Sequence, residues 1–203
     1  MSLAHRRKKR PVEVRGQLLD VAARLCAEVG IANATLDAIS QRAGVSKGGL
    51  LHHFPTKQAL IVALVDKLLD DLLESIESYI AKDPDPVGRF TRAYLLTCLE
   101  GQNNADAEHW NTLGIMLATE TAMRTRWVKW FSKQMRQHGN SDDTIGCLVV
   151  RMAADGFWFS KTVGITSVPS RQKNEFVEQL DRMTRSGSDR LRGHAQRKSR
   201  QLS

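Results

Sequence analysis

The sequence predicts an all-α protein, with an N-terminal three-helix head that contains a helix-turn-helix and a C-terminal helical bundle. Apolar residues recur at helical spacing through most of the 203 residues, and only five residues are proline. No alternating strand pattern and no βαβ rhythm interrupts this spacing. Because 41% of the residues are hydrophobic, the chain can build a packed core. We therefore expect a globular helical chain rather than a disordered one.

The first helix of the head is marked by an apolar stripe that ends at a glycine. Gly30 is placed to stop this helix in a left-handed conformation. After a short link, Thr35 can cap a second helix, and Asp37 in its first turn is favoured by the helix dipole. The stripe of the first helix comprises Leu18, Leu19, Ala22, Leu25, Cys26 and Val29.

A tight corner joins the second helix to a short third one. Gly44 can adopt the positive φ that stops a helix, Val45 can fill the core at the corner, and Ser46 can cap the next helix. That helix runs from Lys47 to about residue 53, and Pro55 marks the start of another. Two short helices joined in this way are typical of a DNA-reading helix-turn-helix, whose second helix enters the major groove. The small core that fixes their angle is expected to comprise Leu36, Ile39, Val45, Leu50 and Phe54.

The rest of the chain predicts long helices that form a body. One helix extends from Pro55 to about Ala81 with a wide apolar stripe, and the segment 82–86 breaks it. Further helices are expected at 86–100, 105–119, 121–138, 142–164 and 170–185. The expected domains are a flexible basic arm (1–12), the head (13–57), the body (58–185) and a disordered basic tail (186–203).

The charge is distributed unevenly along the chain. Residues 1–57 carry ten Lys and Arg against four Asp and Glu, whereas residues 58–170 carry eleven against fourteen. A basic head beside a mildly acidic body suggests a module for a polyanion, although a solvated charged surface explains the charge equally well. The cations of residues 5–10 form either an arm that enters a minor groove or a solubilising tail.

Other classes of protein are disfavoured by the sequence. No apolar stretch reaches the roughly 20 residues of a membrane span, and no hydrophobic signal core follows the basic N-terminus, so we expect a cytoplasmic protein. Cys26, Cys98 and Cys147 lie inside helical apolar patterns and are interpreted as buried small hydrophobes, with redox sensing as the less favoured alternative. We expect neither a cofactor nor a metal.

Two further patterns in the head, a hydrolase motif and a histidine pair, fit their surroundings poorly. The segment from Gly44 to Gly48 matches the G-x-S-x-G nucleophile elbow, with Ser46 as the nucleophile. That elbow requires a preceding strand, which is absent here, so an enzyme is not expected. His52 and His53 are helix neighbours that point about 100° apart, which makes them a poor metal chelate.

The head resembles the tetracycline-repressor (TetR) family of DNA-binding transcriptional regulators. The resemblance extends from about residue 15 to residue 64 and is carried by Thr35–Ser40 and by the continuous segment from Ala43 to Leu60. This segment has Leu51 where the family commonly has tyrosine, and Gly49 where it often has Thr, Ala or Ser. The resemblance implies a homodimer on a double-stranded, semi-palindromic DNA operator. The DNA contacts that it implies are Thr35, Ser46, Lys47, Gly48, Gly49, Leu51, His52, His53 and Lys57.

The resemblance also implies roles for the body. In the family the last two long helices of each subunit pair in the dimer, and here the matching residues are Val149, Met152, Ala153, Gly156, Phe157, Phe176 and Leu180. A small hydrophobic or aromatic effector would enter a pocket whose residues are taken to be Tyr94, Trp110, Met116, Met123, Trp127, Phe131, Met152 and Trp158. For any one of these residues, ordinary core packing is the preferred explanation.

Three functions remain in order of preference. The first is a regulator, more specifically a repressor, that an effector releases from its operator. The second is a ligand-free dimeric DNA-binding protein whose body only dimerises. A helical hydrolase that uses Ser46 is the remote third.

Overall fold

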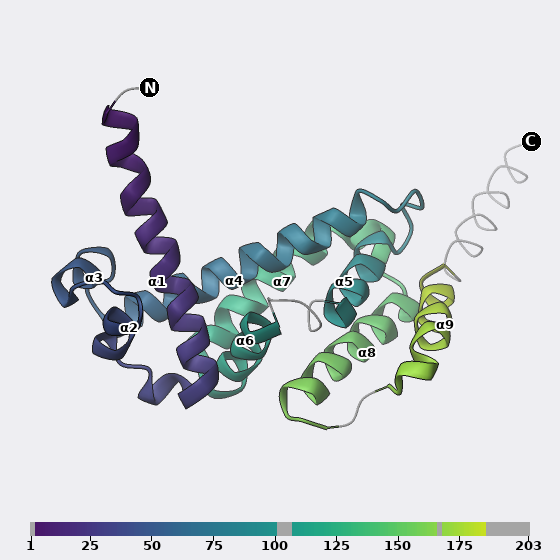
Figure 1. The fold of residues 1–203 in the computed structure, drawn as a ribbon. Coiled ribbons are helices and arrows are strands. Elements are labelled where there is room, and N and C mark those ends of the chain that lie inside the picture. The colour runs from purple at the N-terminus through teal and green to yellow at the C-terminus, as the bar shows by residue number, and fades with distance from the viewer. Residues whose placement is uncertain (1–2, 101–106, 166–167, 186–203) are drawn as a thin grey trace, which may run out of the picture. The chain divides into compact units, whose positions relative to one another are not determined.

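The computed structural model describes residues 3–100, 107–165 and 168–185, and within these ranges it contains helices and no strand (Figure 1). The all-α prediction is confirmed. The head helices are α1 (Leu3–Asn33), α2 (Leu36–Arg42) and α3 (Lys47–His53). The others are α4 (Lys57–Ile80), α5 (Arg89–Glu100), α6 (Ala107–Thr119), α7 (Thr121–Asp142), α8 (Ile145–Thr162), the 3₁₀ turn η1 (Ser170–Gln172) and α9 (Lys173–Arg185).

The beginning of α1 differs from the predicted flexible arm. The helix begins at Leu3 and continues through Pro11, so most of the segment predicted as an arm is helical. Its Leu, Ala, Arg and Lys residues are strong helix formers, and helix propensity needs no apolar periodicity. At the other end the sequence predicts a stop at Gly30 in a left-handed conformation. Gly30 instead has φ 79° and ψ 160°, a non-helical conformation that kinks the helix, and α1 continues to Asn33. The predicted disordered tail, 186–203, lies outside the described residues.

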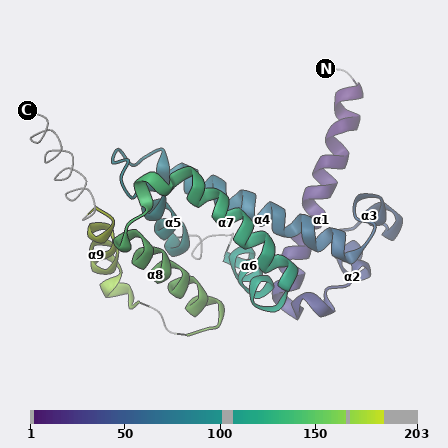
Figure 2. The same cartoon turned by 180° about the vertical axis from the view of Figure 1, so that it is seen from behind.

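The chain forms two compact units, and their limits differ from the predicted boundary at residue 57. The first unit comprises residues 1–71 and 105–127, and the second comprises 72–104 and 128–203. The helix α6 joins the first unit because it packs against α1, where the buried Thr112 hydroxyl donates to the Ala23 carbonyl at 2.9 Å. In the same unit Arg126, in the first turns of α7, pairs with Asp66 of α4 at 2.6 Å; both helices are seen in Figure 2.

In the second unit α8 packs between α5 and α9 (Figure 1). A buried polar cluster joins α5, the end of α7 and α8. The Asp142 carboxylate accepts from the Thr91 amide at 2.7 Å, and Arg151 donates to the Thr91 hydroxyl at 2.8 Å and to the Asp142 carbonyl at 3.1 Å. These buried groups therefore satisfy one another, as burial requires.

The side chain of Arg92 fastens the end of α9 to the link between α4 and α5. It is only 5% exposed, and its Nε lies 2.6 Å from Oδ2 of Asp83. Its Nη1 donates to the Val87 carbonyl at 2.6 Å and to the Thr184 hydroxyl at 3.0 Å, and its Nη2 donates to the Asp85 carbonyl at 2.8 Å. One guanidinium thus holds three parts of the chain together.

Two glycines allow the last turn of α9 to approach closely. A Cβ on Gly88, which has φ 71°, would lie 2.9 Å from Cβ of Thr184. A Cβ on Gly146 would lie 2.1 Å from the Met183 carbonyl oxygen, which is closer than any side chain can pack. Backbone contact, and not only side-chain packing, therefore determines how α8 and α9 cross.

We predict that Arg92→Ala lowers the free energy of unfolding by about 3–5 kcal/mol, because it strips a buried ion pair and leaves loop carbonyls without donors. Arg185→Ala is the control, since Arg185 forms partly exposed ion pairs with Asp85 and Asp181 and should cost less than about 1 kcal/mol. Urea unfolding followed by circular dichroism measures both. Equal losses for the two variants would contradict the role given to Arg92.

The ion pair between Asp83 and Arg92 predicts that the stability of the protein depends on pH. Burial by itself would raise the pKa of Asp83, but the hydrogen bonds from Arg92 and the Asp85 amide, with the charges of Arg92 and Arg185, outweigh it and lower this pKa. The ionised carboxylate therefore stabilises the folded state above about pH 4, and this contribution is lost as the pH falls through the folded pKa. The difference in the free energy of unfolding between wild type and Arg92→Ala should therefore become smaller as the pH falls below about 4. A difference that stays constant down to pH 3 would show that Asp83 does not take part.

Candidate nucleic-acid interface

The corner between α2 and α3 is built as the sequence predicts. Gly44 has φ 66°, and the Val45 amide returns to the Ser40 carbonyl at 3.0 Å. The Ser46 hydroxyl accepts from the Gly49 amide at 3.1 Å, and the Thr35 hydroxyl accepts from the Ala38 amide at 3.1 Å. Both predicted N-caps are therefore confirmed, and both hydroxyls are engaged in capping.

The core beneath the corner is smaller than predicted. Ile39, Leu50 and Phe54 are buried, whereas Leu36 and Val45 are only half-buried. The Arg15 guanidinium on α1 lies 5.2 Å from the centre of the Phe54 ring and covers it. The core nevertheless holds α3 against α1 and α2.

The two glycines of α3 have different surroundings. A Cβ on Gly49 would lie 2.9 Å from Cγ1 of Val45 and 3.2 Å from Oγ of Ser46, so Gly49 faces the corner. A Cβ on Gly48 would have no neighbour within 4 Å. Of the two glycines that the resemblance implies as DNA contacts, Gly48 therefore has open space beside it, while Gly49 serves the packing of the head itself.

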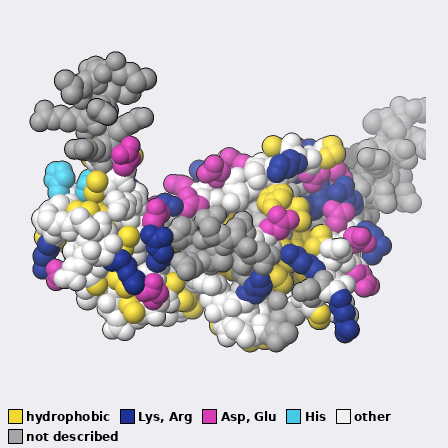
Figure 3. Space-filling model, viewed as in Figure 1, with side chains coloured by type: hydrophobic (Ala, Val, Ile, Leu, Met, Phe, Trp, Pro, Cys, Tyr) yellow, Lys and Arg dark blue, Asp and Glu magenta, His cyan; other side chains and the backbone are white. Residues whose placement is uncertain are grey.

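The outer face of α3 is open. Lys47, Gly48, Leu51 and His52 are exposed and His53 is half-exposed, and histidine side chains gather at the surface of the head (Figure 3). The His52 and His53 rings meet edge to face at 5.5 Å. This face presents donors, an exposed apolar side chain and a gap at Gly48, which is the mixture that base-edge and phosphate contacts use.

The cations around α3 are held by partners within the head. Lys47 lies 2.9 Å from Oδ1 of Asp37, and both side chains are more than half exposed. Lys57 donates to the Ala32 carbonyl at 2.8 Å. Arg42, which the sequence analysis did not single out, pairs with Glu28 at 2.5 Å on the surface. Exposed pairs of this kind are worth at most about 1 kcal/mol, so a phosphate can replace the carboxylate at low cost.

The predicted dimer residues divide into an exposed and a buried set. Met152 is 65% exposed, and Val149 and Gly156 are also exposed. Phe157 and Leu180 are 8% and 7% exposed, so most of their surface packs inside their own unit, and their place at an interface stays a prediction. Ala153 and Phe176 are half-buried. The exposed apolar face of α8 includes residues that the prediction omitted, namely Ile145, Leu148, Phe159 and Val163.

The predicted effector residues are not gathered in one unit. Trp110, Met116, Met123 and Trp127 belong to the first unit, and Tyr94, Phe131, Met152 and Trp158 belong to the second. Met152 is corrected, because it faces solvent rather than a pocket. In the second unit Tyr94 is buried against Phe131, with ring centres 6.0 Å apart, and its hydroxyl donates to the Asp155 carboxylate.

One buried polar group in this region was not predicted. Gln134 on α7 is 1% exposed, and its amide nitrogen has no hydrogen-bond partner among the described residues. Phe131 and His138 lie on the same face of α7, and they contact Tyr94 and Phe90 of α5 with ring centres 6.0 and 4.9 Å apart. Gln134 therefore lies at the α5–α7 seam, the seam formed by Phe90, Tyr94, Phe131 and His138. Glutamine in a helical pattern is ordinarily exposed, so no sequence signal indicated this.

The cysteines are free and buried, as expected. Burial raises the pKa of Cys26 to about 11, partly opposed by the charge of Lys57, and burial also raises the pKa of Cys98. Both thiols are therefore protonated at neutral pH, which disfavours reactivity. None of the helices in the described ranges is long and apolar enough to cross a membrane.

In comparisons with known proteins, two family models match this chain, one over the head and one over most of the remaining residues. Residues 18–64 match the family model of bacterial regulatory proteins of the tetR family, and residues 88–185 match that of the tetracyclin repressor-like C-terminal domain. The transcriptional repressor KstR2 of Rhodococcus jostii is 27% identical over 157 residues, which are 71% of this chain and 76% of that protein. The regulator TtgR of Pseudomonas putida is 35% identical over 85 residues, only 40% of each protein.

Solved structures share the fold. EbrR, a multidrug binding protein solved with malachite green, aligns with a TM-score of 0.63 at 18% identity and covers 84% of this chain and 97% of its own. A TetR-family member of Streptomyces coelicolor, SCO1917, aligns with a TM-score of 0.62 at 20% identity and covers 83% and 98%. These likenesses extend through both units.

Proposed function

Because this chain belongs to the TetR family of DNA-binding transcriptional regulators, we propose that it is a dimeric repressor that a small effector releases from a semi-palindromic operator. The relatives are transcriptional regulators and not enzymes. The hydroxyl of Ser46, which the hydrolase alternative needs as a nucleophile, is used as a helix cap. We also propose that the protein is located in the cytoplasm, because its proposed target is duplex DNA.

The open outer face of α3 is the observation that carries this proposal. Its side chains face away from the head core, and Gly48 leaves room for the backbone to reach a groove. Lys47, at the N-terminal end of α3, would leave Asp37 for a phosphate or a base edge, and Lys57 would hold a phosphate from the first turn of α4. Thr35 and Ser46 would act mainly by orienting the helix ends that face the phosphates.

We predict that Lys47→Ala weakens binding to a duplex selected from a random-sequence library and lowers the slope of log affinity against log salt by about 1. The loss of one phosphate contact is the reason. Fluorescence anisotropy at several salt concentrations measures it, with circular dichroism to check the fold. Lys129→Ala, an exposed lysine of α7, is the matched control. Equal affinities for wild type and Lys47→Ala would show that Lys47 does not contact the DNA.

We propose that α8 forms the dimer interface through its exposed apolar face. Soluble monomers rarely leave an apolar face of this length uncovered, and a second copy would cover it with the same residues. Gly156 lies at its centre without a neighbour within 4 Å of a Cβ, so a helix of the partner could approach there. Such a dimer would space two α3 helices about one DNA turn apart, or a multiple of it.

We predict that Gly156→Arg converts a dimer into a monomer at micromolar concentration. The protomer has room for the added side chain, so its fold should survive, whereas a two-fold seam would receive two unpaired charges. Light scattering measures the mass, and Glu77→Arg on the exposed side of α4 is the control. A wild-type monomer at this concentration would overturn the dimer.

We propose that the effector binds at the α5–α7 seam. An unsatisfied buried amide costs about 1–3 kcal/mol, and a ligand with an acceptor oxygen would recover this. Tyr94, Phe131 and Trp158 remain as aromatic lining in the same unit. The fold shared with the multidrug binding protein EbrR is consistent with a hydrophobic or aromatic ligand. A modest preference for the released state, about 1.4 kcal/mol, changes occupancy tenfold.

We predict that Gln134→Met leaves DNA affinity unchanged, raises the free energy of unfolding by about 1 kcal/mol and abolishes the effector response. The probes are aromatic ketones and esters, which combine an apolar body with one acceptor oxygen. Operator affinity and tryptophan fluorescence report their binding. If no member of the panel changes either quantity in the wild type, the ligand-free architectural alternative is favoured.

A further inference from the structure

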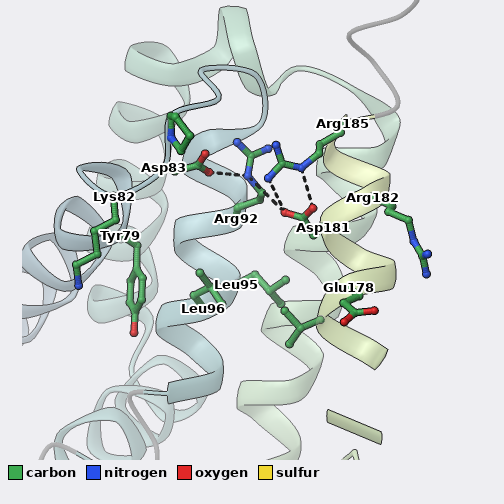
Figure 4. Close-up of a pocket in the computed structure, with 12 residues that line it drawn as sticks. Tyr79, Lys82, Asp83, Arg92, Leu95, Leu96, Glu178, Asp181, Arg182 and Arg185 are labelled. Atoms are coloured by element: carbon green, nitrogen blue, oxygen red, sulfur yellow. Dashed lines mark hydrogen bonds and ion pairs between the residues drawn. The ribbon is translucent and has the colours of Figure 1, made fainter. Parts of the chain in front are cut away.

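The second unit contains an open groove that lies apart from the predicted effector residues. Its volume is about 540 Å³, which is in the range of small-molecule sites. Leu95 and Leu96 of α5 form its floor together with Val177 of α9, and Tyr79 at the end of α4 closes one side (Figure 4). Hydrophobic side chains also surface between α5 and α9 in the space-filling view, with charged ones around them (Figure 3). We call this feature the α5–α9 groove.

Most charges on the rim of the groove are already neutralised. Asp83 is paired with Arg92 at 2.6 Å, and Asp181 is paired with Arg185 at 2.7 Å. Lys82 differs from them: it forms no ion pair with a carboxylate of the described residues, and its Nζ lies 5.5 Å from the centre of the Tyr79 ring. The remaining carboxylate on the rim is that of Glu178, on the α9 side, across the apolar floor from Lys82 (Figure 4).

The hydroxyl of Tyr79 does not compete for a ligand. It donates to the Glu100 carboxylate at 2.5 Å, and burial together with this hydrogen bond and the charge of Glu100 raises the pKa of Tyr79 to about 12. The residue therefore stays neutral and offers only its ring to the groove. The combination is an apolar floor, an aromatic wall and one cation at the α4 end.

We propose that the α5–α9 groove binds a small amphipathic carboxylate, with its apolar chain or ring on Leu95, Leu96 and Val177 and its carboxylate on Lys82. The four cations that line the groove (Lys82, Arg92, Arg182 and Arg185) face three carboxylates (Asp83, Glu178 and Asp181), and this net charge of +1 is the reason to choose an anion. Glu178 sets the direction by repelling the carboxylate from the α9 side. A ligand in this groove contacts α9, whose last turn is held by Arg92 and by the close contact at Gly88. Any effect on DNA binding rests on the proposed function, because α9 packs against α8, the helix whose opposite face is assigned to the dimer.

Isothermal titration calorimetry on the DNA-free full chain tests the proposal with three probes of matched length: decanoate, decanol and decyltrimethylammonium. We expect decanoate to bind with one molecule per chain, at least tenfold more tightly than the other two. Lys82→Glu should weaken decanoate at least tenfold, and Val177→Glu should do the same through the floor. Lys129→Glu, which makes the same charge change elsewhere on the surface, should leave decanoate binding unchanged, and so should Gln134→Met at the α5–α7 seam.

The proposal is overturned if decanol binds as tightly as decanoate, if the trimethylammonium probe binds more tightly, or if Lys82→Glu and Lys129→Glu behave alike. Because these titrations contain no DNA, a protein that bound decanoate but no DNA would contradict the proposed function alone. Conversely, a protein that bound DNA but not decanoate would contradict only the proposed ligand of the α5–α9 groove.

Discussion

The close seating of α3 against its corner is the constraint on which the head depends. The left-handed Gly44 reverses the chain, Ser46 caps the new helix, and Gly49 leaves no side chain between α3 and Val45. Because these contacts fix the inner side of a helix of only seven residues, its other side is left for a partner. The capping hydroxyls therefore orient the helix ends, and we propose that they act on DNA mainly in this way.

The second unit is organised by a different kind of constraint. Arg92 supplies four hydrogen bonds to a loop and to the end of α9, and Gly88 and Gly146 bring the backbone of α9 close. These contacts occupy the side of α8 that faces α5 and α9, so the opposite side of an apolar helix is exposed. The contacts that stabilise the protomer therefore determine which residues of α8 are available to a second copy.

The sequence predicts much of the fold and of the head, and less of the body. Helix ends were predicted closely where Gly, Pro, Ser and Thr mark them, as at Gly30, Ser46 and Thr35. The helical start of α1 was missed because a run of Lys and Arg has helix propensity without periodicity. The resemblance assigns Phe157 and Leu180 to an interface, whereas both pack inside their own unit, and a single sequence does not show which apolar residues of a helix its own protomer buries.

Long-range contacts explain the remaining errors. The aromatic residues of the predicted pocket are divided between units because α6 packs on α1, which a single sequence does not reveal. Buried Arg92 and Gln134 look like ordinary surface residues in a helical pattern, since arginine and glutamine are mostly exposed in proteins. Their positions follow from tertiary structure alone.

In the proposed complex, two copies of the open α3 face read one duplex together. Hydroxyl-radical footprinting of the wild-type complex on a library-selected duplex tests this arrangement. We expect two protected patches related by a two-fold axis and centred about one helical turn, or a multiple of it, apart. A single protected patch, or uniform protection along the duplex, would contradict it.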